Sequence, residues 1–238
     1  MSAVTQAKSR RLWLIRHAQA SFGSDDYDVL SKVGHEQSQR LAAWLVAHPD
    51  LVFSHVCRGA LRRHKETLAA IELAFSNANR PLPEVVEDED WNEFDYAGIV
   101  RAYATSRLDD LVDAAVRDPS NRRAVHALLA AALREWALGN LNGVAESWQA
   151  FGSRIARARE KLQSAPPGKI LVVSSAGPIA QCAQAALGCD AERTVALNIA
   201  LRNTAVSEFR ARETWEMQIW NMLPHLSSPA DHEVVTYY

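Results

Sequence analysis

Short apolar runs alternate along this chain with longer segments in which apolar residues recur every three to four positions. Four of these runs predict strands, at residues 11–16, 51–57, 84–87 and 169–174. The first and last hold four consecutive apolar residues each, which is typical of strands buried on both faces. Near the carboxyl end, alternating segments at 204–210 and 215–222 predict a hairpin.

The helical spacing fills the intervals between these strands. One helix is expected to begin after Ser31, which can cap it, and to run to about residue 48. A second is expected over about 60–75. A third should contain Pro178 in its first turn and end at Gly188, since proline suits the start of a helix and glycine its end.

Strands that alternate with helices predict an α/β fold of three layers, in which a mostly parallel sheet is flanked by helices. We expect the whole chain, 1–238, to form one domain. Within it, the segment from about 97 to 161 is rich in Ala, Leu, Arg and Glu and predicts a helical insertion over the strand ends. Ligands of such folds bind beyond the carboxyl ends of the strands, so the site is expected just after residues 16, 57 and 174.

Composition excludes several classes of protein. The 26 Lys and Arg residues nearly balance the 28 Asp and Glu, which argues against a nucleic-acid-binding protein. Three cysteines with no CxxC pair predict neither a disulfide framework nor a zinc site. No signal peptide is recognisable and every apolar run is too short to cross a bilayer, so we expect a cytoplasmic protein without a membrane partner. A homo-oligomer stays open, because the 215–220 strand could pair with a second copy.

Arg16 and His17 follow the first predicted strand, where a ligand is expected. A neutral imidazole can attack phosphorus, and a guanidinium can hold phosphoryl oxygens with paired hydrogen bonds. An Arg-His pair is usually an unremarkable surface feature, so the surrounding sequence has to decide.

The surrounding sequence favours phosphorus chemistry. Residues 16–23, Arg-His-Ala-Gln-Ala-Ser-Phe-Gly, and then Leu-Ser-Lys-Val-Gly at 30–34 with Gln37, resemble the opening of the histidine phosphatase superfamily, the phosphoglycerate mutase-like group. That opening is Arg-His-Gly followed by a loop and Leu-Ser/Thr-x-x-Gly-x-x-Gln. The resemblance implies a phosphoglycerate mutase-like fold, with His17 as the nucleophile and Arg16 as a phosphate ligand.

Two later segments extend the resemblance. Residues 59–67, Gly-Ala-Leu-Arg-Arg-His-Lys-Glu-Thr, are similar to the family's small-x-Leu-x-Arg-x-x-x-Thr segment, which assigns its second phosphate-binding arginine to Arg63 and not to Arg62 or Arg58. Residues 91–96, Trp-Asn-Glu-Phe-Asp-Tyr, are similar to a segment whose glutamate is the acid/base group. The resemblance therefore implies that Glu93 exchanges protons with the substrate.

The third strand end departs from the family pattern. Residues 172–179, Val-Val-Ser-Ser-Ala-Gly-Pro-Ile, align with Val-Ser-His-Gly-Gly-x-Ile, so Ser175 stands where the family has its second histidine. Ala176 and Ala18 likewise replace glycines, and Gly23 stands where an asparagine often binds phosphate. A neutral hydroxyl donates a weaker hydrogen bond than an imidazolium does, so Ser175 is expected to bind phosphate while weakening catalysis.

These residues predict hydrolysis of phosphomonoesters through a phosphohistidine on His17. The expected partner is a small phosphorylated substrate or phosphate. No cofactor and no metal is expected, because the two guanidiniums can offset the phosphoryl charge. Further candidates for contact with the substrate are Ser21, Gly23, His64 and Ala176.

Two alternatives stay open. The chain could be a catalytically impaired regulatory protein that binds phosphate or a phosphoester. The serine at position 175 favours this alternative. A phosphoglycerate mutase is less favoured, because the sequence singles out no extra groups to hold a sugar acid. The basic run Arg154, Arg157, Arg159 and Lys161 is expected to face solvent along one helix.

Overall fold

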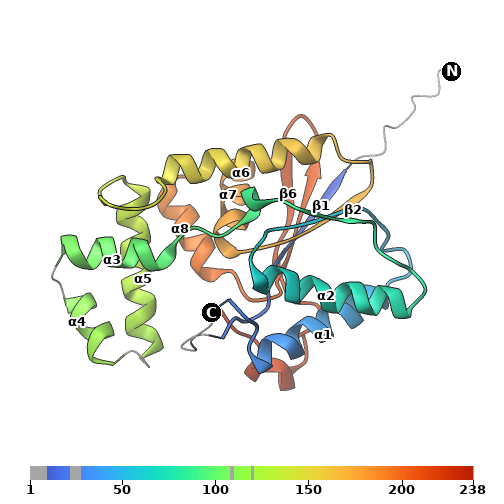
Figure 1. Cartoon of the computed structure of the whole chain (residues 1–238), viewed down its shortest axis with the longest axis horizontal. Coiled ribbons are helices and arrows are strands. Elements are labelled where there is room, and N and C mark those ends of the chain that lie inside the picture. The colour runs from blue at the N-terminus through green and yellow to red at the C-terminus, as the bar shows by residue number, and fades with distance from the viewer. Residues whose placement is uncertain (1–9, 22–27, 108–109, 119–120, 238) are drawn as a thin grey trace.

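A computed structural model describes residues 10–21, 28–107, 110–118 and 121–237. Six strands of these residues form one sheet in the order β3-β2-β4-β1-β5-β6 (Figure 1). The strands are β1 (Arg11–Arg16), β2 (Phe53–Arg58), β3 (Val85–Glu87), β4 (Lys169–Ser174), β5 (Val206–Ala211) and β6 (Trp215–Met222). β1 to β4 are parallel, whereas β5 runs antiparallel to β1 and β6 antiparallel to β5. The predicted mostly parallel sheet and the hairpin are both confirmed.

Helices cover both faces of the sheet, which gives the predicted three layers. Figure 1 shows α1 (Lys32–Val46) and α2 (Arg62–Asn77) on one face, with α6 (Trp148–Gln163) and α7 (Ala176–Leu187) on the other. The apolar run of β1 is explained by this double cover. Leu12 and Leu14 belong to the core under α6 and α7, and Ile15 to the core under α1 and α2.

Local signals in the sequence locate the helix ends. Ser31 caps α1, because its side chain accepts a hydrogen bond from the backbone N–H of Gly34. Pro178 lies in the first turn of α7, and Gly188 follows its last residue, as predicted.

The segment between β3 and β4 is helical. It contains η1 (Glu89–Trp91), α3 (Tyr96–Ser106), α4 (Asp110–Arg117) and α5 (Arg122–Ala137) before α6. In Figure 1, α3, α4 and α5 form a lobe at one end of the molecule, beside α8 (Ala191–Ala200), a helix that we did not predict. None of the helices formed by the described residues has both the length and the apolar character needed to span a bilayer.

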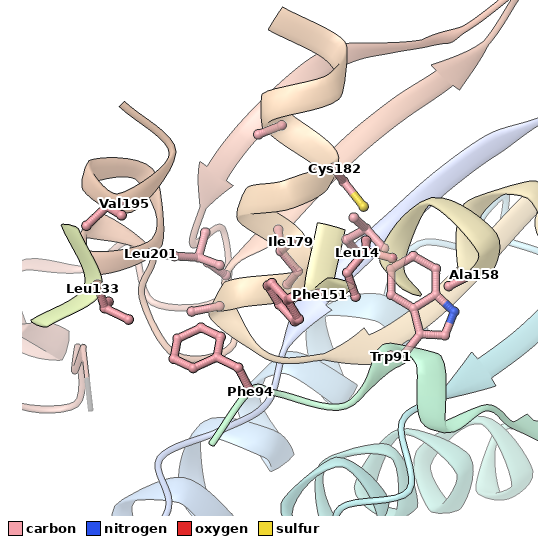
Figure 2. Packing of buried hydrophobic residues seen from close by; sticks show 14 of the residues in the cluster. Leu14, Trp91, Phe94, Leu133, Phe151, Ala158, Ile179, Cys182, Val195 and Leu201 are labelled. Carbon is pink, nitrogen blue, oxygen red and sulfur yellow. The ribbon is translucent and has the colours of Figure 1, made fainter. Parts of the chain in front are cut away.

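Two aromatic residues anchor the segment that leads from η1 to α3. Figure 2 shows Trp91 and Phe94 entering the same apolar cluster, Trp91 toward Ala158 and Phe94 toward Phe151. The rings of Phe94 and Phe151 meet edge-to-face with centroids 5.4 Å apart. Since the two anchors lie on either side of Glu93 in sequence, they fix the backbone that carries this carboxyl group.

Candidate active site

The carboxyl ends of three strands meet at one edge of the sheet. β1 pairs with β4 so that Arg16 lies opposite Ser174, and the backbone N–H of His17 donates to the Ser174 carbonyl at 2.8 Å. The N–H of Gly59, directly after β2, donates to the Val173 carbonyl at 3.1 Å. The three places in which we expected a ligand are therefore neighbours.

His17 is buried, and its ring is fixed at both nitrogens. Nδ1 lies 2.7 Å from the Ala18 carbonyl oxygen, which can only accept, so Nδ1 carries the hydrogen. Nε2 then has a free lone pair, which accepts a hydrogen bond from Arg63 Nε at 3.1 Å. This tautomer leaves Nε2 as the nucleophilic atom of the ring.

The surroundings of His17 keep the imidazole neutral. Burial lowers the pKa of His17 well below its ordinary value, and the charges of Arg63 and Arg16 and the His64 ring lower it further. The hydrogen bond to the Ala18 carbonyl opposes these effects without outweighing them. A neutral imidazole is the form that can attack phosphorus.

Arg63 comes to His17 from the first turn of α2. Its Nη1 donates to Asp28 Oδ1 at 2.6 Å while its Nε faces His17. Thr67, one helical turn further on, accepts from the Ala18 N–H at 3.0 Å and donates to the Arg63 carbonyl at 2.7 Å. The Thr67 hydroxyl thereby joins the end of β1 to the start of α2.

The other two arginines of this segment bind elsewhere. Arg62 Nε forms an ion pair with Glu66 at 2.8 Å, and Arg58 forms one with Glu87 at 2.7 Å. The structure therefore brings to His17 the arginine that the motif assigned.

The carboxyl-terminal segment reaches Arg16. The Arg16 guanidinium donates to the carbonyl of Leu201 and, at 2.8 Å, to that of Tyr237. Gln37, from α1, holds the same segment by donating to the Val234 carbonyl at 2.6 Å and to the Thr236 hydroxyl at 2.8 Å. Our sequence reasoning missed this contact, because no local pattern signals a partnership between residues so far apart.

Glu93 lies against the amino-terminal end of α7. Its Oε2 accepts a hydrogen bond from the Gly177 N–H at 3.2 Å. Burial raises the pKa of Glu93 above the usual carboxyl value, although the Gly177 N–H and the charges of Arg63 and Arg16 favour the ionised form. A carboxyl group with a raised pKa is suited to donate a proton near neutral pH.

Part of the basic run of α6 binds the segment that carries Glu93. Arg157 and Lys161 are exposed, as expected of the run, whereas only 16% of the Arg154 side chain is exposed. Arg154 Nη1 donates to the carbonyls of Asp90 at 3.0 Å and Asn92 at 2.9 Å. Lys161 forms an ion pair with Asp88 at 2.9 Å. The acidic residues before Glu93 supply partners for these cations, so both clusters position the acid/base candidate.

Ser175 and His64 meet beside His17. The Ser175 hydroxyl oxygen lies 2.7 Å from His64 Nε2, and both side chains are completely buried. Ala176, which follows, is also buried.

Ser21 donates its backbone N–H to the Val29 carbonyl at 2.8 Å. Gly23 lies outside the described residues.

No group of three or more His, Cys, Asp and Glu side chains is placed to hold a metal ion within the described ranges.

A groove of about 560 Å³ lies between α3 and the segment after α5, lined by Asp95, Arg101, Thr105 and Asn142 among others. Asp95 follows Glu93 by two residues, so this groove begins close in sequence to the acid/base candidate.

A substitution at Gly177 tests how closely Glu93 packs against the start of α7. A Cβ atom at this position would lie 2.2 Å from Glu93 Oε1 and 2.6 Å from the Phe94 ring. We expect Gly177→Ala to cost about 1–3 kcal/mol in unfolding free energy through overpacking and to displace the Glu93 carboxyl. Urea unfolding measures the loss of stability, and a crystal structure of the variant shows where the Glu93 carboxyl lies.

Gly152→Ala is the matched control for Gly177→Ala. Its Cβ would meet only the side chain of Gln181, at 3.3 Å, so this helical glycine should accept the methyl group without loss of stability. Equal stability of the two variants would show that Glu93 is not packed against the start of α7 as described.

The geometry at the strand ends agrees with a comparison between this sequence and known protein families. Residues 12–222 match the histidine phosphatase superfamily (branch 1). The chain belongs to this superfamily. No curated protein matches the sequence significantly.

Several solved structures of low sequence identity share the fold of this chain. A putative alpha-ribazole-5'-P phosphatase from Escherichia coli is 23% identical with a TM-score of 0.61, over 90% of this chain and 97% of that one. A mycobacterial glucosyl-3-phosphoglycerate phosphatase, solved with inorganic phosphate, is 19% identical with a TM-score of 0.60, over 92% and 100%. A phosphoserine phosphatase variant from Entamoeba histolytica, in complex with phosphoserine, is 16% identical with a TM-score of 0.63, over 91% and 99%.

Proposed function

We propose that this protein hydrolyses phosphomonoesters through a phosphohistidine on His17. The observation that carries the proposal is the fixed tautomer of His17, whose Nε2 lone pair faces the Arg63 guanidinium at 3.1 Å. An attacking nitrogen and a cation for the phosphoryl oxygens are thus held together before a substrate arrives. Arg16, from the same strand end, adds a second positive charge that is felt by both His17 and Glu93.

In the first step, the hydrogen bond from Arg63 to His17 Nε2 opens, and Nε2 attacks phosphorus in line with the leaving oxygen. The N–P bond forms while the P–O bond to the leaving group breaks. Glu93 gives its proton to the departing oxygen, which leaves as an alcohol. Arg63 and Arg16 stabilise the charge on the phosphoryl oxygens.

In the second step, water replaces His17 on phosphorus. The Glu93 carboxylate takes a proton from the attacking water, a new P–O bond forms and the N–P bond breaks. His17 returns to its neutral form and inorganic phosphate leaves. Glu93 is protonated again, so each turnover restores both groups.

The two pKa shifts predict the pH dependence of turnover. The first step needs neutral His17 and protonated Glu93. Burial lowers the pKa of His17 and raises the pKa of Glu93. Activity toward alkyl phosphates should therefore persist at mildly acidic pH and decline as rising pH removes the Glu93 proton. A pH profile of kcat/KM measures this decline, and an alkaline limb that survives in Glu93→Gln would contradict the assignment.

Substrate turnover and trapping of the intermediate test the proposal together. The panel begins with p-nitrophenyl phosphate, phosphoserine and other phosphomonoesters of the kinds that the solved relatives are named for. Labelled substrate is mixed with enzyme and quenched in alkali, because the N–P bond of phosphohistidine survives base but not acid. We expect label on the peptide that contains His17.

The remaining outcomes separate the alternative functions. Orthovanadate binding without turnover of any phosphomonoester would favour a phosphate-binding regulatory protein. Conversion of 3-phosphoglycerate into an isomer without release of phosphate would identify a mutase. Turnover without label on His17 would overturn the phosphohistidine route.

A further inference from the structure

His64 and Ser175 are buried polar side chains near His17 to which the proposed mechanism gives no task. His64 comes from the first turn of α2, next to Arg63, and Ser175 lies between β4 and α7. The separation of their imidazole and hydroxyl groups, 2.7 Å, is that of a hydrogen bond.

The place of the His64 ring is built into the backbone. A Cβ atom on Gly59 would lie 2.3 Å from His64 Nδ1 and 2.8 Å from its Cε1. Any other residue at position 59 would therefore collide with the ring where it now lies. The glycine at the end of β2 allows His64 to turn inward at the start of α2, where its side chain is completely buried.

Ser175 uses its hydroxyl in an unusual way for its position. It is the residue that precedes the first turn of α7, where a serine side chain ordinarily accepts a hydrogen bond from the helix N–H groups. The Ser175 side chain makes no such capping bond. Its oxygen instead lies against His64 Nε2, so the hydroxyl is committed to the cluster at the strand ends.

The His64 ring also lies beside the proposed nucleophile. The ring centroids of His17 and His64 are 5.6 Å apart. Burial holds the pKa of His64 well below its ordinary value, and Arg63 and Arg58 lower it further, so the ring is neutral near pH 7. In the tautomer that carries its hydrogen on Nε2, the His64 ring would donate it to the Ser175 oxygen, which would leave the hydroxyl hydrogen for another acceptor.

We propose that His64 and Ser175 form a coupled donor to the phosphoryl oxygens, in which His64 orients the Ser175 hydroxyl toward the phosphoryl group that His17 attacks. The proposal rests on the proposed function. It also accounts for the departure at position 175, because the imidazole absent from the β4 end is supplied by α2. Ser175 is then the group that touches the substrate, and His64 is its positioning residue.

A double-mutant cycle tests the coupling. Removing a donor that acts in the transition state typically lowers kcat by about 10²–10³-fold. We expect a loss of this size in His64→Ala and in Ser175→Ala, and about the same loss in the double variant, because one coupled donor is lost in each case. His35→Ala, which removes an exposed histidine of α1, should leave kcat unchanged. Fully additive losses, or none in His64→Ala, would overturn the proposal.

A swap variant separates this role from a structural one. His64→Ala combined with Ser175→His keeps one imidazole and one small side chain at the two positions. We expect the kcat of the swap variant to be at least tenfold higher than that of His64→Ala. The two variants should have the same thermal stability. A folded swap variant that recovers nothing would contradict the proposal.

Binding of orthovanadate, measured by calorimetry, distinguishes a failure of this inference from a failure of the proposed function. If the wild type shows no turnover that depends on His17, the phosphatase proposal fails, while the affinity for vanadate still reports on the donor pair. We expect His64→Ala to weaken vanadate binding at least tenfold and the swap variant to restore it. Equal affinity of all three proteins would overturn the donor role.

Discussion

Replacing His17 with alanine should lower phosphomonoester turnover by at least about 10⁴-fold, the scale on which enzymes lose activity when a covalent nucleophile is removed. The reason is the fixed geometry of the ring. Of the two rings at this site, His17 is the one whose Nε2 accepts a hydrogen bond from Arg63, whereas His64 directs its Nε2 to Ser175. Steady-state assays and the labelled intermediate should therefore disappear together.

The control for His17→Ala is His55→Ala, on the same sheet. His55 is a half-buried residue of β2 that the proposed mechanism does not use. It should keep wild-type turnover. Phosphate binding should persist in His17→Ala, since Arg16 and Arg63 remain. A His17→Ala protein that still forms an alkali-stable phosphoenzyme would show that another residue is the nucleophile.

Replacing Glu93 with glutamine should lower kcat for alkyl phosphates by about 10²–10⁴-fold, the usual contribution of general acid–base catalysis. Glutamine keeps the size of the side chain, and its amide oxygen can still accept from the Gly177 N–H. It cannot give a proton to the leaving oxygen or take one from water. The loss therefore measures proton transfer separately from packing.

A substrate with a good leaving group shows which of the two steps accounts for the lower kcat of Glu93→Gln. p-Nitrophenolate departs without a proton, so Glu93→Gln should still release a burst of p-nitrophenol equal to the enzyme present. The second step then stalls, because water is not deprotonated, and the phosphoenzyme accumulates. Rapid-mixing absorbance shows the burst. A Glu93→Gln protein with no burst and uniformly slow release would assign Glu93 to binding.

The strands with both faces buried were predicted to the residue. β1 and β4 lie between two helical layers, so their apolar runs have sharp ends in the sequence. β2 begins two residues later than the apolar run that predicted it, at Phe53. The helix α8 was missed. Its signal is Asp190, which caps it, but Thr194, Val195 and Asn198 are weak helix formers, and α8 depends on packing against α5 and α7.

The candidate site was predictable where motifs carried it and not where distant contacts built it. His17, Arg63 and Glu93 were assigned from short motifs that resemble those of the family, and the structure gathers them at one edge of the sheet. The bond between His64 and Ser175 joins residues 111 positions apart. The role of Gly59 in admitting the His64 ring is equally invisible in one sequence, since its reason is a contact between side chain and backbone.

The contact between Arg16 and the Tyr237 carbonyl makes residue 237 part of the surroundings of the proposed phosphate site. Shortening the chain before this residue would remove a backbone acceptor that steadies one of the two proposed phosphate-binding guanidiniums. Any shortened form of the protein should therefore keep residue 237 if Arg16 is to hold the position described.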